Sequence, residues 1–113
     1  MIEVLKFGSS VLKGPEDVPR VAEAVARRVR EGWRPVVVVS AMGDTTDYLM
    51  SLARRVSKNP KGRELDMLLT AGERTSMALV AMALEERGVR AASFTGSQVG
   101  IITDTNFGRA RIK

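Results

Sequence analysis

The sequence predicts an α/β fold, specifically a three-layer α/β/α sandwich with a mainly parallel sheet. Residues 36–40 read Val-Val-Val-Val-Ser, and an unbroken apolar run of this kind is typical of a parallel strand covered on both faces. Strand-like and helix-like segments alternate along the chain, which favours parallel strands joined by helical crossovers. Small polar residues follow the strand candidates, where open α/β sheets bind their ligands.

The first predicted strand covers residues 2–7 and runs into the turn Gly8-Ser9-Ser10. A helix should begin near Val18, with Asp17 as a possible N-cap, because apolar residues recur every three or four positions as far as Val29. Gly32 ends this pattern. The opening third of the chain therefore predicts a strand, a helix and the start of a second strand.

After the second strand, Asp44 or Thr45 can cap a helix that extends to about residue 56. The longest helical pattern follows over residues 63–87, and Gly72 predicts an interruption that divides it into two helices. Residues 91–94 and 99–103 are further strand candidates. Three strand ends with polar turns predict one shared crevice.

Composition limits the classes of function. The 113 residues are 44% hydrophobic, enough for one compact domain, and no stretch approaches the roughly 18 consecutive apolar residues of a membrane span. The chain has no Cys and no His, which excludes thiol nucleophiles, imidazole bases and the usual zinc sites. Its net charge is +5, but the basic residues are mixed with glutamates, so solvated helix faces are favoured over a nucleic-acid surface. We expect a cytoplasmic protein.

Three places could carry chemistry. Lys6 precedes Gly8 and Ser9 by two and three residues, so its ammonium and the turn amides could hold phosphate oxygens, although a tight turn with a snorkelling lysine explains them equally well. The second turn supplies the hydroxyls of Ser40 and Thr46, of which a helix N-cap would explain only one. Glu73 could accept hydrogen bonds from an ammonium group, or be a surface residue at a helix start.

Five segments together resemble the aspartate kinases, members of the amino acid kinase superfamily. They are KFG at 6–8, VVSAMGDTTD at 38–47, ELDMLLTAGER at 64–74, SFTGSQVGI at 93–101 and GRARI at 108–112. They occur in order and cover nearly the whole chain. The resemblance implies the N-terminal lobe of an amino acid kinase-like fold and phosphorylation of the side-chain carboxylate of L-aspartate by MgATP.

The resemblance also implies roles for single residues. Lys6 would be catalytic and contact the transferred phosphoryl group, while Gly8, Ser9 and Ser40 would bind phosphate. Ser40, Thr46 and Glu73 would bind the amino acid. The implied cofactors are ATP and Mg²⁺, the metal being held by the nucleotide phosphates and not by the protein. The implied partners are L-aspartate and ATP, with a second copy or a second kinase lobe, and neither nucleic acid nor membrane.

The sequence departs from the family pattern in two ways. Ser9 stands where aspartate kinases have a second glycine, and the Gly-Ser-Ser-Val version of this turn is similar to glutamate 5-kinase. Aspartate kinases are also several times longer, so we expect residues 1–113 to be a truncated N-terminal lobe, inactive alone, without the nucleotide lobe and ACT domains. The alternative is a non-catalytic amino-acid-binding or assembly module.

Overall fold

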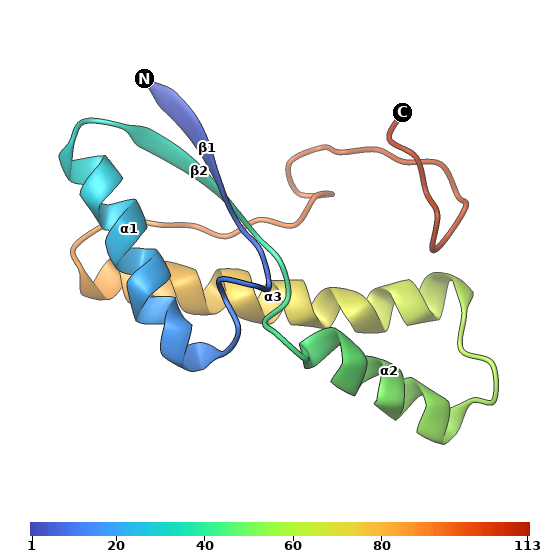
Figure 1. Ribbon diagram of the computed structural model, residues 1–113. Helices are drawn as coiled ribbons and strands as arrows, with labels where there is room; N and C mark the ends of the chain where they lie inside the picture. Colours follow the sequence, from blue (N-terminus) through green and yellow to red (C-terminus); the bar gives the residue numbers. More distant parts are fainter.

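The computed structural model describes residues 1–113 and confirms the α/β class (Figure 1). Parallel strands alternate with helices, as the sequence predicts. The elements in chain order are β1 (Ile2–Phe7), the 3₁₀ turn η1 (Pro15–Asp17), α1 (Val18–Arg30), β2 (Arg34–Val39), α2 (Thr45–Val56) and α3 (Gly62–Glu86).

The two strands form a parallel pair connected through α1. Ile2 is level with Arg34 and Phe7 with Val39, so the strands begin and end together. Leu5, Phe7, Val37 and Val39 point to one side of this sheet, where they pack against the core. Because side chains alternate between the faces of a strand, this register places one whole apolar row on the helices.

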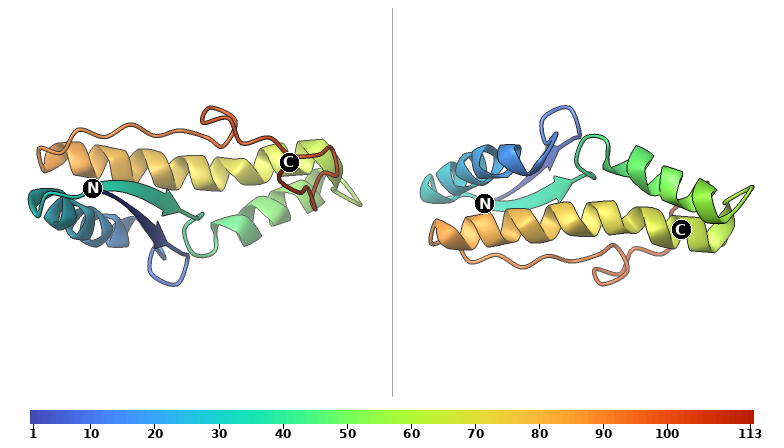
Figure 2. Two further views of the ribbon diagram at one scale, coloured as in Figure 1. Left: turned by 90° about the horizontal axis from the view of Figure 1, so that it is seen from above. Right: turned by 90° about the horizontal axis from the view of Figure 1, so that it is seen from below.

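The core lies between the sheet and helices α1 and α3, which contact each other directly. Its centre is formed by α1, whose Val21, Ala22 and Ala26 are almost completely buried at the spacing that the sequence predicts. Leu12 joins them from the loop after β1, and α3 adds Val80 and Leu84. Helix α2 packs instead on the first half of α3 (Figure 2).

The opposite face of the sheet differs from the three-layer expectation. Val4 is 68% exposed and Val36 is 51% exposed, and the register places them side by side. The apolar run of β2 is therefore covered on one face by the helices of this chain and open on the other. The helices gather on one side because α1 and α3 bury their apolar faces against each other as well as against the sheet.

Two predicted strands are not formed. Residues 91–94 lie in an extended segment beside α3, with no backbone hydrogen bonds to β2, so the sheet has two strands and not three. Of residues 99–103 only Thr103 pairs, through an isolated antiparallel bridge to Ile112. The predicted shared crevice is not formed by all three turns, because the groove that the third turn lines includes β2 and α3 but no residue of β1 or of the turn after it.

The predicted interruption at Gly72 was also wrong, because α3 is one helix of 25 residues. Gly72 is buried, and a Cβ atom there would lie 2.8 Å from the Cβ of Ala41 and 3.3 Å from Cγ2 of Thr45. The missing side chain therefore lets α3 approach the chain between β2 and α2. Gly72 serves close packing and does not end a helix.

Helix α3 is also long and apolar enough to cross a membrane by length and composition, with a mean hydropathy of 1.2 over 18 residues. In this fold it contacts α1, α2 and β2 and carries Val80 and Leu84 into the core. These contacts bury 22% of that window, so most of its apolar residues lie outside the core of this chain.

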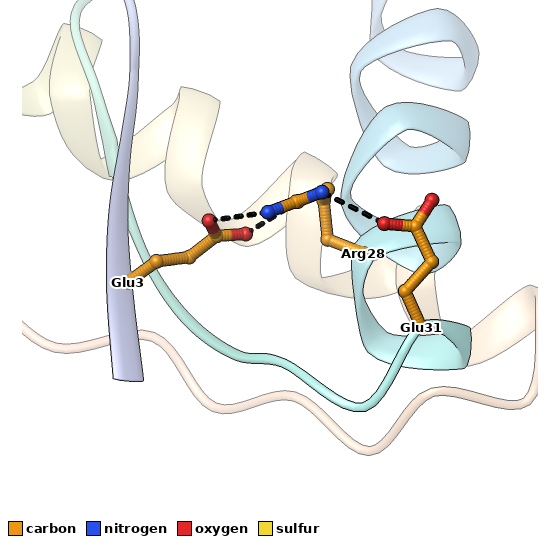
Figure 3. Close-up of polar contacts among 3 residues, drawn as sticks. All are labelled: Glu3, Arg28 and Glu31. Atoms are coloured by element: carbon orange, nitrogen blue, oxygen red, sulfur yellow. Dashed lines mark hydrogen bonds and ion pairs between the residues drawn. The ribbon is translucent and has the colours of Figure 1, made fainter. Parts of the chain in front are cut away.

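An ion-pair cluster joins the other ends of the strands and α1 (Figure 3). The Arg28 guanidinium donates from Nε to Oε1 of Glu3 at 2.7 Å and from Nη2 to Oε2 at 2.8 Å, while Nη1 donates to Glu31 at 2.7 Å. It also lies 4.9 Å from the centre of the Trp33 ring. The hydrogen bonds from Arg28 lower the pKa of the Glu3 carboxyl. The cluster fixes the start of β1 against the end of α1.

Candidate functional site

The turns that follow β1 and β2 lie side by side at the carboxyl end of the sheet. The amide of Ser40 donates to the carbonyl of Phe7 at 3.3 Å, directly after the last paired residues of the two strands. Lys6, level with Val38 in the register, is exposed just before the first turn. The parallel register thus brings Lys6 and Ser40 to the same edge, where α/β folds bind ligands.

The first turn is anchored to the core on one side and open to solvent on the other. The carbonyl of Gly8 accepts hydrogen bonds from the amides of Val11 at 3.1 Å and Leu12 at 2.9 Å, and the buried Leu12 side chain anchors the loop. An added Cβ at Gly8 would meet no atom within 4 Å. Gly8 and the exposed Ser9 therefore border free space in which a ligand could approach the backbone.

The second turn is fastened to the first through Gly43. Its amide donates to the carbonyl of Leu12 at 3.2 Å, and a Cβ at this position would overlap the carbonyl oxygen of Lys13. Gly43 also has φ of +37°, in the left-handed region that favours glycine. The two turns consequently form one packed unit.

The hydroxyls of the second turn are available to a ligand to different degrees. Ser40 is half-buried and its Oγ donates to the neighbouring carbonyl of Ala41 at 3.3 Å, a long contact that a better acceptor could replace. Thr46 is exposed in the first turn of α2. The predicted side-chain N-caps do not form at α1 or α2, because neither Asp17 nor Asp44 makes a capping hydrogen bond there.

Glu73 lies close to this edge because Gly72, the residue before it in α3, packs against the second turn. Gly72 packs against Ala41 and Thr45, which adjoin Ser40 and Thr46 in the chain. Glu73 is exposed and forms no ion pair, so its carboxylate is free to accept hydrogen bonds. It lies in the middle of α3, and the expectation of a helix start at this residue was wrong.

A groove of about 1120 Å³ runs along α3 between β2 and the segment after the helix. Glu73 lines it together with Thr70 and Arg74 of α3 and with Ser97 from the third polar turn. The sequence prediction overlooked Thr70 and Arg74. Their signal was available, because they flank Glu73 at three residues and one residue along the predicted helix.

The structure brings some predicted residues together and leaves others apart. The two turns and the Gly72 region of α3 are in contact, whereas Lys6 and Glu73 form no ion pair. The edge therefore offers the Lys6 ammonium, several hydroxyls and backbone amides, and the Glu73 carboxylate with Arg74 next to it. Such a set can bind an anion at one point and an ammonium group at another.

The chain matches the amino acid kinase family over residues 1–112. It is 57% identical over 109 residues to the aspartokinase of Mycolicibacterium smegmatis and 54% identical over 109 residues to that of Corynebacterium glutamicum. Each alignment covers 96% of this chain and 26% of the relative. The chain thus spans about a quarter of the length of these curated relatives.

A solved structure of aspartate kinase from Synechocystis has a similar fold. It superposes with a TM-score of 0.81 and 46% sequence identity, covering 87% of this chain and 17% of that chain. Together with the family match over residues 1–112, this similarity confirms the resemblance found in the sequence motifs. The chain belongs to the amino acid kinase family.

Proposed function

We propose that this chain supplies the amino-acid-binding and phosphoryl-binding lobe of a cytoplasmic aspartate kinase. The reaction is transfer of the γ-phosphoryl group of ATP to the side-chain carboxylate of L-aspartate, which gives 4-phospho-L-aspartate. The relatives named aspartokinase, at 50–57% identity, support this choice of activity.

One observation carries the proposal most directly: the turns after β1 and β2 and the Gly72–Glu73 segment of α3 meet at the carboxyl end of the sheet. These are three of the segments on which the family resemblance rests. Phosphoryl transfer depends mainly on positioning and on cations near the charged oxygens, and a preformed edge with a lysine meets both needs.

On the phosphate side, we assign Lys6, Gly8, Ser9 and Ser40. The Lys6 ammonium would face the transferred phosphoryl group and offset the charge that develops on its oxygens. Gly8 and Ser9 border open space and can present their amides to phosphate. During transfer an oxygen of the aspartate side chain bonds to the γ-phosphorus, the bond to the bridging oxygen breaks, and ADP leaves.

On the amino-acid side, we assign Ser40, Thr46 and Glu73. The free Glu73 carboxylate can accept hydrogen bonds from the α-ammonium group of aspartate, and the hydroxyls can donate to its carboxylates. Glu73 is held by α3, which the Gly72 contact positions against the second turn. Binding therefore relies on a rigid helix on one side and a packed turn on the other.

ATP and Mg²⁺ are the cofactors implied by this activity. We propose that Mg²⁺ is held by the phosphates of ATP, as the family resemblance implies. The chain's own contribution would be Lys6 and the turn amides, which fit phosphate oxygens.

Amide chemical-shift mapping of the purified chain tests the assignment. Addition of L-aspartate should shift the signals of Ser40, Thr46 and Glu73, and addition of MgATP should shift those of residues 6–9. Glu73→Gln should weaken L-aspartate binding about 10- to 100-fold, because a hydrogen bond to a charged group is lost. Lys6→Met should weaken only the MgATP response, and Glu85→Gln, on the same helix, is the matched control.

Three outcomes would contradict the proposal in different ways. Equal loss of aspartate binding in Glu73→Gln and Lys6→Met would contradict the division of roles. A stronger response to L-glutamate than to L-aspartate would indicate a substrate like that of glutamate 5-kinase, in keeping with the Gly8-Ser9-Ser10 turn. A folded chain that responds to neither ligand would favour a non-catalytic assembly module.

A further inference from the structure

The connection between α2 and α3 carries a dense cluster of positive charge. We call residues 54–63 the basic tip; its cations are Arg54, Arg55, Lys58, Lys61 and Arg63, all of them exposed. The tip contains no acidic residue. Figure 2 shows this connection at the end of the molecule remote from α1.

The basic tip accounts for the net charge of the chain. It holds five of the 18 basic residues, and the 13 that remain equal the 13 acidic residues in number. The formal charge of +5 is therefore that of the tip alone. Only Arg63 has a counter-charge, an exposed contact of 2.6 Å to Glu64, and the other four cations form no ion pair.

Helix stability does not explain this placement. Arg54 and Arg55 in the last turn of α2 suit the helix dipole. Lys61 and Arg63, however, lie at the start of α3, where the dipole and the neighbouring cations both disfavour positive charge. Arg63 is offset only by its exposed contact to Glu64 and Lys61 has no such contact, and a sequence that breaks a local rule in this way is expected at functional positions.

An apolar side chain lies within the cluster. Val56, the last residue of α2, is 87% exposed, more than any other large hydrophobic residue of the chain. The tip has no aromatic residue on which a nucleic-acid base could stack. A lone aliphatic side chain surrounded by cations fits a protein segment that carries both carboxylates and an apolar residue.

We propose that the basic tip is a docking surface for an acidic segment of a partner protein. The Arg54 and Arg55 guanidinium groups can each bind a carboxylate through two hydrogen bonds, and Val56 contacts an apolar residue between the acidic ones. Arg63, the last residue of the tip, lies about 15 Å along α3 from Glu73, since ten residues at 1.5 Å each separate the two. This surface is therefore separate from the proposed substrate site.

The experiment uses the 113-residue chain and a synthetic 12-residue peptide that alternates Glu with Gly and has one central Leu. The variant Arg55→Glu/Lys58→Glu/Lys61→Glu should bind the peptide about tenfold more weakly at low salt. The control Lys13→Glu/Arg27→Glu/Arg34→Glu changes net charge equally, at exposed residues elsewhere, and should lose less than about twofold. Val56→Ser should weaken binding only when the peptide contains the Leu.

Equal losses in the two triple variants would overturn the proposal, because binding would then follow net charge alone. Tighter binding to a 12-base-pair DNA duplex or to phosphatidylserine vesicles than to the peptide would also overturn it, in favour of nucleic acid or membrane. Circular dichroism of each variant confirms that it is folded, and an unchanged response to L-aspartate separates this result from the fate of the proposed substrate site.

Discussion

Gly72 determines how closely α3 approaches the turn after β2, and Gly72→Ala tests this directly. Alanine is the better helix former by about 1 kcal/mol, yet its Cβ would lie 2.8 Å from that of Ala41. We expect a net loss of about 1–3 kcal/mol in the free energy of unfolding, since overpacking outweighs propensity. Urea unfolding measures it.

The neighbouring exposed Ala71 provides the control for this substitution. Ala71→Gly should cost only about 0.5–1 kcal/mol, the difference in helix propensity, because no packing contact changes there. Equal or greater stability of Gly72→Ala compared with the native chain would show that α3 can move away from Ala41, and that the contact does not set its position.

Glu3 should make stability depend on pH at the far end of the sheet. Its pKa is lowered below the ordinary value of 4.5, chiefly by the hydrogen bonds from Arg28, so the pair stabilises the fold above about pH 4.5 and is lost as pH falls through the lowered pKa. Glu3→Gln should therefore be less stable than the native chain at pH 7, with the difference shrinking at acidic pH. Urea midpoints between pH 2 and 7 measure it.

A second glutamate provides the control for the pH series with Glu3→Gln. Glu85 is exposed and forms no ion pair, so Glu85→Gln should change the midpoints equally little at every pH. A Glu3→Gln difference that stays constant down to pH 2 would contradict this, because it would show that the loss does not come from the charge of Glu3.

At the scale of the elements, the packing of α3 against the rest of the chain depends on one row of buried residues. Gly72, Ser76, Val80 and Leu84 recur every four residues and are its buried positions. Leu84→Ala should cost about 2–5 kcal/mol, because it leaves a cavity between α1 and α3. Met82→Ala, on the same helix but 61% exposed, should cost about 0.5 kcal/mol or less. Similar losses for the two would contradict this packing.

The sequence predicts best those elements whose local residue pattern alone determines their structure. Residues 2–7 were predicted as a strand and form β1 over Ile2–Phe7, and the turn Gly8-Ser9-Ser10 follows them. Gly72 misled the prediction, since a glycine that ends a helix and one that permits close packing look alike in sequence. Only the contact with Ala41, 31 residues earlier, distinguishes the two uses.

At the scale of the molecule, stability should be unevenly distributed. Amides of α1 and β2 are hydrogen-bonded and close to the core, whereas those of residues 91–94 form no backbone hydrogen bonds. Hydrogen exchange should therefore be slowest in α1 and fastest in residues 91–94, and the Ile101 amide, bonded to the carbonyl of Gly96 at 2.9 Å, should exchange more slowly than the amides of residues 91–94. Strong protection of Ala92 and Phe94 would instead indicate a third strand.

The common position of the two strand ends was easier to predict than the layers around them. Lys6 and Ser40 could be placed at one edge from the sequence, because parallel strands of equal length end together. The exposure of Val36 could not be predicted from the sequence, since a run of β-branched residues has the same pattern whether one face of the strand is covered or both. Local patterns predict where strands end, and only the assembled fold shows which of their faces are covered.

Because α3 is one unbroken helix, it can tilt as a rigid body. Its 25 residues span roughly 37 Å. The close contact at Gly72 is the point about which it would tilt. The basic tip lies at the N-terminal side of this point, and the core residues Val80 and Leu84 lie at the C-terminal side. A tilt of about 5° about this point would move the start of the helix by roughly 1.3 Å while Glu73, next to it in the chain, stays almost still. The same tilt would move Val80 and Leu84 in the core more than it moves the Glu73 carboxylate.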